Sequence, residues 1–269
     1  MCFSSSVTAR DDETVKSSSV LVSRTTDDVH YSPLLPGLPD DVSKHCLALV
    51  PRSHLPVMGA VSKRWRSFIK SGEFVTVRRL AGVLEERLYI LTVDVNGKGS
   101  HWEVLDCFGN KQSELPQMPG PAKVSFGVVV LNGKLIVLAG YSLIDGIVSV
   151  SDDAYQYDSF LNSWSKLGKM KTPRYDFACA AVNGKVYAVG GCGSDGESLS
   201  SAEVYDPDSN EWTRIESLRR PRWGCFACGI EGKLYVMGGR SSFTIGNSRF
   251  VDVYAPERRS WCEPMKNGC

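Results

Sequence analysis

Three groups of residues in this 269-residue chain have types and spacings that could do chemistry. The first is a G-x-G-x-x-G run at residues 191–196, which directly follows an apolar segment. In dinucleotide-binding proteins such a run opens a helix whose N-terminal amides hold the pyrophosphate. Here residues 197–206 lead into another β-type segment instead of a helix. We therefore interpret the run as a loop between strands and expect no cofactor.

The second group is the C-x-x-C pair of Cys225 and Cys228. A structural zinc site needs a second pair of ligands, and the sequence offers neither another C-x-x-C nor a pair of His residues nearby. Its histidines are His30, His45, His54 and His101. Without His in the later part of the chain, Ser or Cys triads and His-ligated metal sites have no base or ligand there. We expect no metal and no catalytic residues, and interpret the two thiols as buried strand residues.

The third group consists of basic residues in equivalent positions: Lys123, Arg174 and Arg222 each stand just before a β-type run. Tyr175 and Trp223 directly follow the two arginines. If these residues lie on loops between structural units, they would form a ring of cations and aromatics that suits an acidic or phosphorylated partner. The alternative is that each cation braces its own loop by bonding backbone carbonyls. Both interpretations stay open.

The elements that must position these groups are predicted by an internal repeat. The turn Asn132-Gly133-Lys134 recurs as Asn183-Gly184-Lys185 and as Glu231-Gly232-Lys233, at intervals of 51 and 48 residues. Asn-Gly between two apolar runs is a strong hairpin signal. A third β-type run follows in each unit, and a fourth begins at Trp164, Trp212 or Trp261. A weaker first copy contains Leu88–Ile90, Val104–Asp106 and, at the Trp position, Gln112. The pattern predicts four units of about four strands.

A helical segment precedes the repeats. Pro39 with Asp40 and Asp41 makes a good helix start, and apolar residues at helical spacing over 34–70 predict three short helices, the last carrying Val61 and Trp65. About forty residues are too few for a stable core of their own, so we expect this module to need a partner surface. Residues 1–32 are rich in Ser and are predicted to be a disordered tail.

These motifs resemble two known families. The period, the Gly190-Gly191 and Gly238-Gly239 doublets and the spaced Tyr and Trp residues resemble kelch repeats over residues 81–269, while LPDD, VP and VSKRW within residues 34–70 resemble an F-box. Together the chain resembles plant F-box/kelch-repeat proteins. The resemblance implies an α+β fold in two parts, a three-helix F-box followed by an all-β kelch propeller. The expected boundaries are 33–80 for the F-box and 81–122, 123–172, 173–221 and 222–269 for four blades.

The resemblance implies a substrate receptor of an SCF-type ubiquitin ligase without catalysis of its own. The F-box would dock on a Skp-type adaptor, and through it on a cullin scaffold, and the kelch blades would hold a client protein. The expected adaptor-binding residues are Leu38, Pro39, Val42, Leu47, Val50, Pro51, Leu55, Val61 and Trp65. The expected client-binding residues are Lys123, Arg174, Tyr175, Arg222 and Trp223. The apolar F-box residues could alternatively form a self-contained core.

Kelch propellers usually close with about six blades, so four units predict an open arc with exposed apolar faces. We interpret this as a truncated product or alternative isoform, with four-bladed closure as the alternative. Alternative functions are a kelch-fold binding protein or a regulatory fragment that docks without presenting a client, and then a propeller enzyme.

Bulk composition limits the other partners and the location. The net charge of +1 provides no global attraction to nucleic acid or anionic lipid. The sequence contains no apolar run of membrane-spanning length and no secretory signal. Nine scattered cysteines without a signal indicate reduced thiols, and hence a cytoplasmic or nuclear protein.

Overall fold

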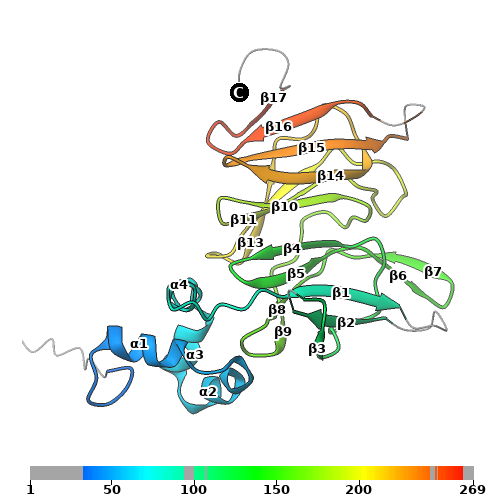
Figure 1. Ribbon diagram of the computed structural model, residues 1–269. Coiled ribbons are helices and arrows are strands. Elements are labelled where there is room, and N and C mark those ends of the chain that lie inside the picture. The colour runs from blue at the N-terminus through cyan, green and yellow to red at the C-terminus, as the bar shows by residue number, and fades with distance from the viewer. Residues whose placement is uncertain (1–32, 94–99, 107, 243–245, 247, 263–269) are drawn as a thin grey trace, which may run out of the picture.

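In the computed structural model, residues 33–93, 100–106, 108–242, 246 and 248–262 are described. A small helical module comes first and is followed by a stack of antiparallel sheets (Figure 1). The predicted tail at residues 1–32 lies outside the described residues. No helix in the described part of the chain is long and apolar enough to span a membrane.

The helical module contains four α-helices and a 3-10 helix, where the sequence predicted three helices. They are α1 (Asp40–Ala48), η1 (Arg52–His54), α2 (Leu55–Val61), α3 (Lys63–Lys70) and α4 (Gly72–Leu80). The extra boundaries lie at Ser62 and Ser71, which adopt extended backbone angles and cap the helices that follow. The Ser62 hydroxyl accepts from the Trp65 amide at 3.1 Å. Val61 therefore ends α2 instead of belonging to α3, which corrects the predicted grouping.

The Ser62 cap supports a stability prediction. Ser62→Ala removes the acceptor for an otherwise unpaired amide at the start of α3, so we expect it to lower the free energy of unfolding by about 1 kcal/mol. Ser67→Ala, at an exposed position inside α3, is the matched control and should change stability by less than about 0.5 kcal/mol. Urea unfolding followed by circular dichroism measures both. Equal midpoints for the two variants would contradict the capping role.

The module shares its core with the sheets. Its buried residues include Leu47, Leu55 and Phe74, and the same cluster contains Phe160 from a turn between two later strands. The Phe74 and Phe160 rings meet edge to face at 5.1 Å. The Arg52 guanidinium lies 4.3 Å from the centre of the Phe160 ring and its Nε donates to the Ser159 carbonyl at 3.3 Å. Burial lowers the pKa of Arg52 to about 10, so it stays charged at neutral pH. The helical module therefore packs against one sheet, at the turn that contains Ser159 and Phe160.

The strands of the described residues form four main sheets and one separate hairpin. The first has three strands: β1 (Leu88–Val93), β2 (Ser100–Leu105) and β3 (Lys111–Glu114). The second has β4 (Gly127–Leu131), β5 (Lys134–Leu138), β8 (Ala154–Asp158) and β9 (Ser163–Lys166), and a separate hairpin made of β6 (Tyr141–Ile144) and β7 (Ile147–Val150) is inserted after β5. The third has β10 (Ala178–Val182), β11 (Lys185–Val189), β12 (Ala202–Asp206) and β13 (Glu211–Ile215). The fourth has β14 (Trp223–Ile230), β15 (Lys233–Arg240), β16 (Val251–Ala255) and β17 (Ser260–Cys262).

The turn and glycine predictions are confirmed by the backbone. Asn132 and Gly133 have φ of 50° and 74°, the left-handed pair that a tight hairpin needs. At the end of β11 a Cβ on Gly191 would lie 2.5 Å from the Tyr175 carbonyl oxygen. The backbone of the neighbouring loop approaches too closely there for any side chain.

The sheets form an open stack (Figure 1). Strands β4, β10 and β14, the first of each four-stranded sheet, lie side by side in that order. The Trp that opens each fourth strand contacts a Tyr of the third, as in the 5.3 Å pair of Tyr205 and Trp212. Leu88 on β1, in the first sheet, and Phe226 on β14, in the fourth, are 55% and 62% exposed. The arc therefore has the exposed apolar ends that its four units predicted.

Candidate protein-binding surfaces

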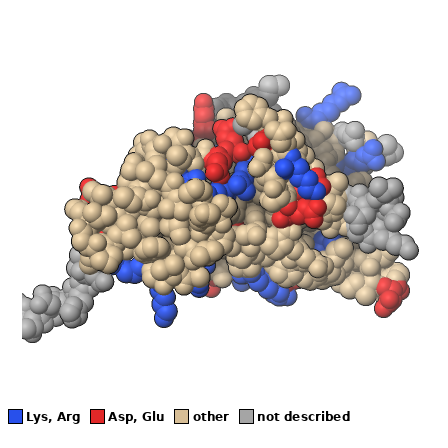
Figure 2. All heavy atoms as spheres, turned by 60° about the horizontal axis from the view of Figure 1, so that its bottom comes forward, with Lys and Arg blue, Asp and Glu red and all other residues tan. Residues whose placement is uncertain are grey.

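The helical module keeps large aliphatic side chains in solvent. Leu38, Val42 and Val61, all predicted to bind an adaptor, are 40%, 42% and 62% exposed. Leu49 and Val57, which lie outside the predicted adaptor-binding set, are also exposed. Figure 2 shows few charged side chains over the broad left-hand face from which the N-terminal trace emerges. Exposed aliphatics on a small module are typical of a protein-binding surface.

The other predicted adaptor-binding residues divide by burial. Pro39 and Pro51 are exposed, while Val50 and Trp65 are half-buried. The Trp65 indole Nε1 donates to the Leu34 carbonyl at 2.8 Å, so its polar edge is used within the module.

Leu47 and Leu55 are buried in the module's own core and do not reach its surface. These two residues are core residues, and their core also includes Phe160 of the second sheet, so it is not self-contained. Arg64 lies 3.8 Å from Asp40 and so brings the start of α1 close to the start of α3, beside Val61. Leu38 and Val42 flank the start of α1, so they lie at this same end of the module.

Arg174, predicted to contact a client, is inside the third sheet. It and Glu203 are both 0% exposed, and their charged groups lie 2.7 Å apart. The same guanidinium donates to the carbonyls of Gly190 at 2.7 Å and Ser201 at 3.0 Å. Burial lowers the pKa of Arg174 and the neighbouring Glu203 carboxylate opposes that shift. The Arg174 side chain therefore links the segment that leads into β10 to the end of β11 and the start of β12.

Lys123 and Arg222 do the same in their own sheets. Arg222 pairs with Asp252 and donates to the Phe250 carbonyl at 3.3 Å, and the Lys123 ammonium donates to the Ser151 hydroxyl at 2.7 Å. All three cations are buried, so they do not form the accessible ring that a client would need. This corrects the expected arrangement. The three cations do occupy equivalent places, each just before the first strand of a sheet. Their side chains point inward because each has an acidic, hydroxyl or carbonyl partner there.

The aromatic members of the predicted client-binding set remain partly exposed. The Tyr175 ring meets that of Tyr141 edge to face at 5.2 Å. Trp223 is half-buried beneath Arg240, whose guanidinium carbon lies 5.9 Å from the ring centre. Contact of these two aromatics with a client stays a prediction.

The sulfur and glycine motifs have structural roles. In the G-x-G-x-x-G run, Cys192 forms β-bridges with Tyr175 and with Ser198, so the run is a loop between strands, as predicted. Cys225 and Cys228 are free and lie on β14, half-buried where full burial was expected. Burial raises the pKa of the Cys225 thiol, which suppresses its reactivity. Cys262 is disulfide-bonded, so the expected set of uniformly reduced thiols fails at that residue.

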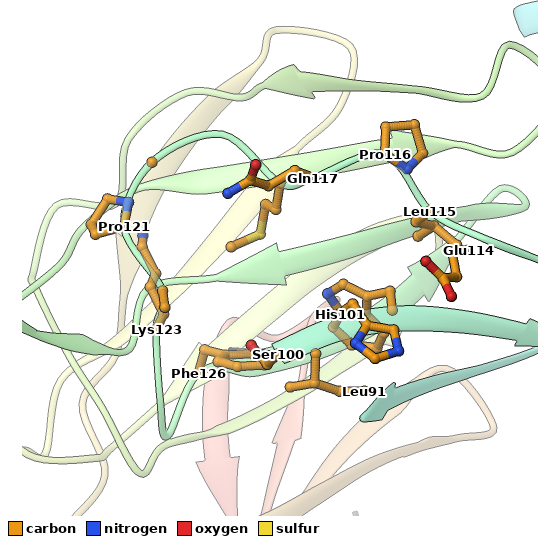
Figure 3. Close-up of a pocket in the computed structure, with 14 residues that line it drawn as sticks. Leu91, Ser100, His101, Glu114, Leu115, Pro116, Gln117, Pro121, Lys123 and Phe126 are labelled. Atoms are coloured by element: carbon orange, nitrogen blue, oxygen red, sulfur yellow. The ribbon is translucent and has the colours of Figure 1, made fainter. Parts of the chain in front are cut away.

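A cavity of about 350 Å³ lies between the first sheet and the segment that leads into β4 (Figure 3). His101 and Glu114 reach it from one side, and Lys123 lines the other. In the described part of the chain, His101, Glu103 and Glu114 form one group whose ligand atoms lie within 4.8 Å of one another. The Lys111 ammonium bridges the two carboxylates at 2.7 and 2.8 Å and lowers the pKa of both. A cation of the protein itself therefore balances this acidic pair.

Comparison with known families matches both parts of the chain. The F-box domain family matches residues 35–76, and the Kelch motif matches residues 173–219. An Arabidopsis thaliana relative, F-box/kelch-repeat protein At1g67480, is 59% identical over 248 residues, which cover 92% of this chain and 66% of the relative. A second, At1g27420, is 43% identical over 86% of this chain and 67% of its own length. The chain belongs to the F-box/kelch-repeat family.

The family assignment confirms the resemblance inferred from the sequence motifs. This F-box/kelch chain spans about two thirds of the length of these two relatives. Among solved structures, one described as the structure of YjhT superposes with a TM-score of 0.55 at 16% identity, covering 67% of this chain and 65% of the other. At that identity the match concerns the fold alone, and it agrees with stacked propeller-type sheets. In the F-box/kelch chain, the F-box match falls on the helices that carry the exposed aliphatic residues.

Proposed function

We propose that this F-box/kelch protein is a non-enzymatic substrate receptor of an SCF-type ubiquitin ligase. Its F-box would dock on a Skp-type adaptor linked to a cullin, and its blades would hold a client for ubiquitination. The observation that carries the proposal is an F-box match on residues 35–76 whose helices leave Leu38, Val42 and Val61 in solvent, in one chain with kelch sheets. A cytoplasmic or nuclear location is part of this proposal.

The docking step can be tested with purified components. We expect the full chain to capture a plant Skp-type adaptor, and the double variant Val42→Asp, Val61→Asp to weaken that binding by at least about 30-fold. Each substitution replaces an apolar anchor by a charge that the interface would have to bury, which should cost at least ~1 kcal/mol of binding free energy. Isothermal titration calorimetry measures the affinity.

Leu80→Asp is the matched control, because Leu80 is exposed on α4 and lies outside the predicted docking set. We expect that variant to bind the adaptor as the wild type does. Circular dichroism verifies that each variant keeps its helices. Failure of the wild-type chain to bind, or undiminished binding by the double variant, would refute the proposed docking.

A further inference from the structure

The β6–β7 hairpin projects from the blade at the end opposite the F-box helices. Strand β5 begins at Lys134, beside the turn residue Gly133, near which the Arg52–Ser159 contacts of the helical module lie. It ends at Leu138, and the hairpin follows directly. Figure 1 shows β6 and β7 on the right of the sheets and the helices at the lower left. A segment bound to the hairpin would leave the F-box free.

One face of this hairpin is a continuous apolar surface. Leu143 pairs with Val148, and Tyr141 pairs with Val150 on one side and with Val124 on the other. Directly paired residues of antiparallel strands point to the same face, and alternate residues along a strand share it. These five side chains form what we call the apolar strip: Val124, Tyr141, Leu143, Val148 and Val150. Leu143, Val148 and Val124 are 66%, 57% and 50% exposed.

Carboxylates lie at one end of the apolar strip. Tyr141 contacts Tyr175, which forms a β-bridge with Cys192. Burial raises the pKa of the Cys192 thiol, and the carboxylates of Asp176, Asp195 and Glu197 add to that rise, so all three lie near this position.

Asp195 and Glu197 are exposed, and the segment that contains them has no Lys or Arg. Residues 135–165 and 186–213 contain no Lys or Arg. The basic residue that directly precedes the strip, Lys123, is buried against Ser151. The surface therefore combines aliphatic side chains with the exposed carboxylates of Asp195 and Glu197, which complements an apolar segment that carries positive charge.

We propose that the apolar strip and the carboxylates beside it bind an extended client segment in which apolar residues alternate with Lys or Arg. This inference rests on the proposed function, since it names the class of client that the receptor would hold. An extended segment fits because its alternate side chains would face the strip while the others reach the carboxylates. The sequence predicted a basic surface that binds an acidic client. The structure favours an acidic surface and a basic client, because the three predicted cations are buried whereas Asp195 and Glu197 are exposed.

The test uses three fluorescein-labelled decapeptides and the full chain bound to its Skp-type adaptor. One alternates valine and lysine, one valine and glutamate, and one serine and lysine. Fluorescence anisotropy should show the valine–lysine peptide binding at least 10-fold more tightly than either of the others. Asp195→Asn with Glu197→Gln should weaken that binding several-fold and reduce its dependence on salt.

Two hairpin variants locate the site. Leu143→Ser with Val148→Ser should weaken binding of the valine–lysine peptide by at least 10-fold. Ile144→Ser with Ile147→Ser is the matched control, because these residues form a directly opposed pair on the other face of the same hairpin, and it should leave binding within about 2-fold of wild type.

Three results would overturn the inference: equal binding of the valine–glutamate peptide, equal loss in both hairpin variants, or a concentration-dependent dimer that Leu143→Ser with Val148→Ser abolishes. The last would assign the strip to a second copy of the chain. Adaptor capture, measured on the same samples, separates this inference from the proposed function. Loss of peptide binding with intact adaptor capture contradicts only the client surface, whereas absent adaptor capture contradicts the receptor proposal itself.

Discussion

Arg174→Ala is expected to lower the free energy of unfolding by about 3–5 kcal/mol, the usual cost of removing one partner from a buried ion pair. The variant leaves the Glu203 carboxylate fully buried without its counter-ion. It also removes the donors to the carbonyls of Gly190 and Ser201. Both losses act on the junction between β10, β11 and β12, which the guanidinium holds together. Urea unfolding monitored by tryptophan fluorescence measures the change.

The matched control is Lys185→Ala. Lys185 and Asp206 are also 2.7 Å apart in the same sheet, but their side chains are 45% and 34% exposed. Solvent screens such a pair, so its loss should cost at most about 1 kcal/mol. Replacing both buried partners, with Arg174→Met and Glu203→Leu, should recover part of the stability lost in Arg174→Ala because no lone charge remains buried. An Arg174→Ala effect no larger than that of Lys185→Ala would show that burial does not strengthen this pair.

Trp212→Ala is expected to destabilise the protein by a similar amount, about 3–5 kcal/mol, through the cavity that it leaves. Trp212 is 2% exposed and belongs to the core cluster that joins the second and third sheets, with Ile136, Leu167 and Val186. In the described part of the chain its indole nitrogen has no hydrogen-bond partner. Trp212→Phe should therefore cost much less, since it keeps most of the ring volume and removes an unpaired buried donor.

Trp164→Ala provides the comparison for Trp212→Ala. Trp164 holds the equivalent position in the second sheet but is half-buried, and its Nε1 donates to the Pro116 carbonyl at 2.7 Å. Its loss should cost about 1–2 kcal/mol, from one hydrogen bond and partial burial. Thermal unfolding by circular dichroism ranks the variants. If Trp164→Ala is as damaging as Trp212→Ala, the inter-sheet cluster is not where the stability resides.

The sequence by itself determined the parts of this protein that depend on local backbone geometry and on repetition. Asn132-Gly133 needs left-handed angles that few residues adopt, so the turn and its recurrence could be located without coordinates. The recurring Trp at the start of each fourth strand set the length of each unit. The F-box motifs located the helical module, although Ser62 and Ser71 divided it more finely than apolar periodicity indicated.

Only the tertiary structure decided where the charged groups point and which apolar residues stay in solvent. Arg174 meets Glu203 across 29 residues of sequence, and nothing local to either position indicates that their charges pair inside a sheet. In the same way, Leu143 and Ile144 are adjacent aliphatics, and strand register alone places them on opposite faces of one hairpin. Burial and direction arise from contacts between segments far apart in the chain, which is why the client-facing charge could be assigned only after the sheets were seen together.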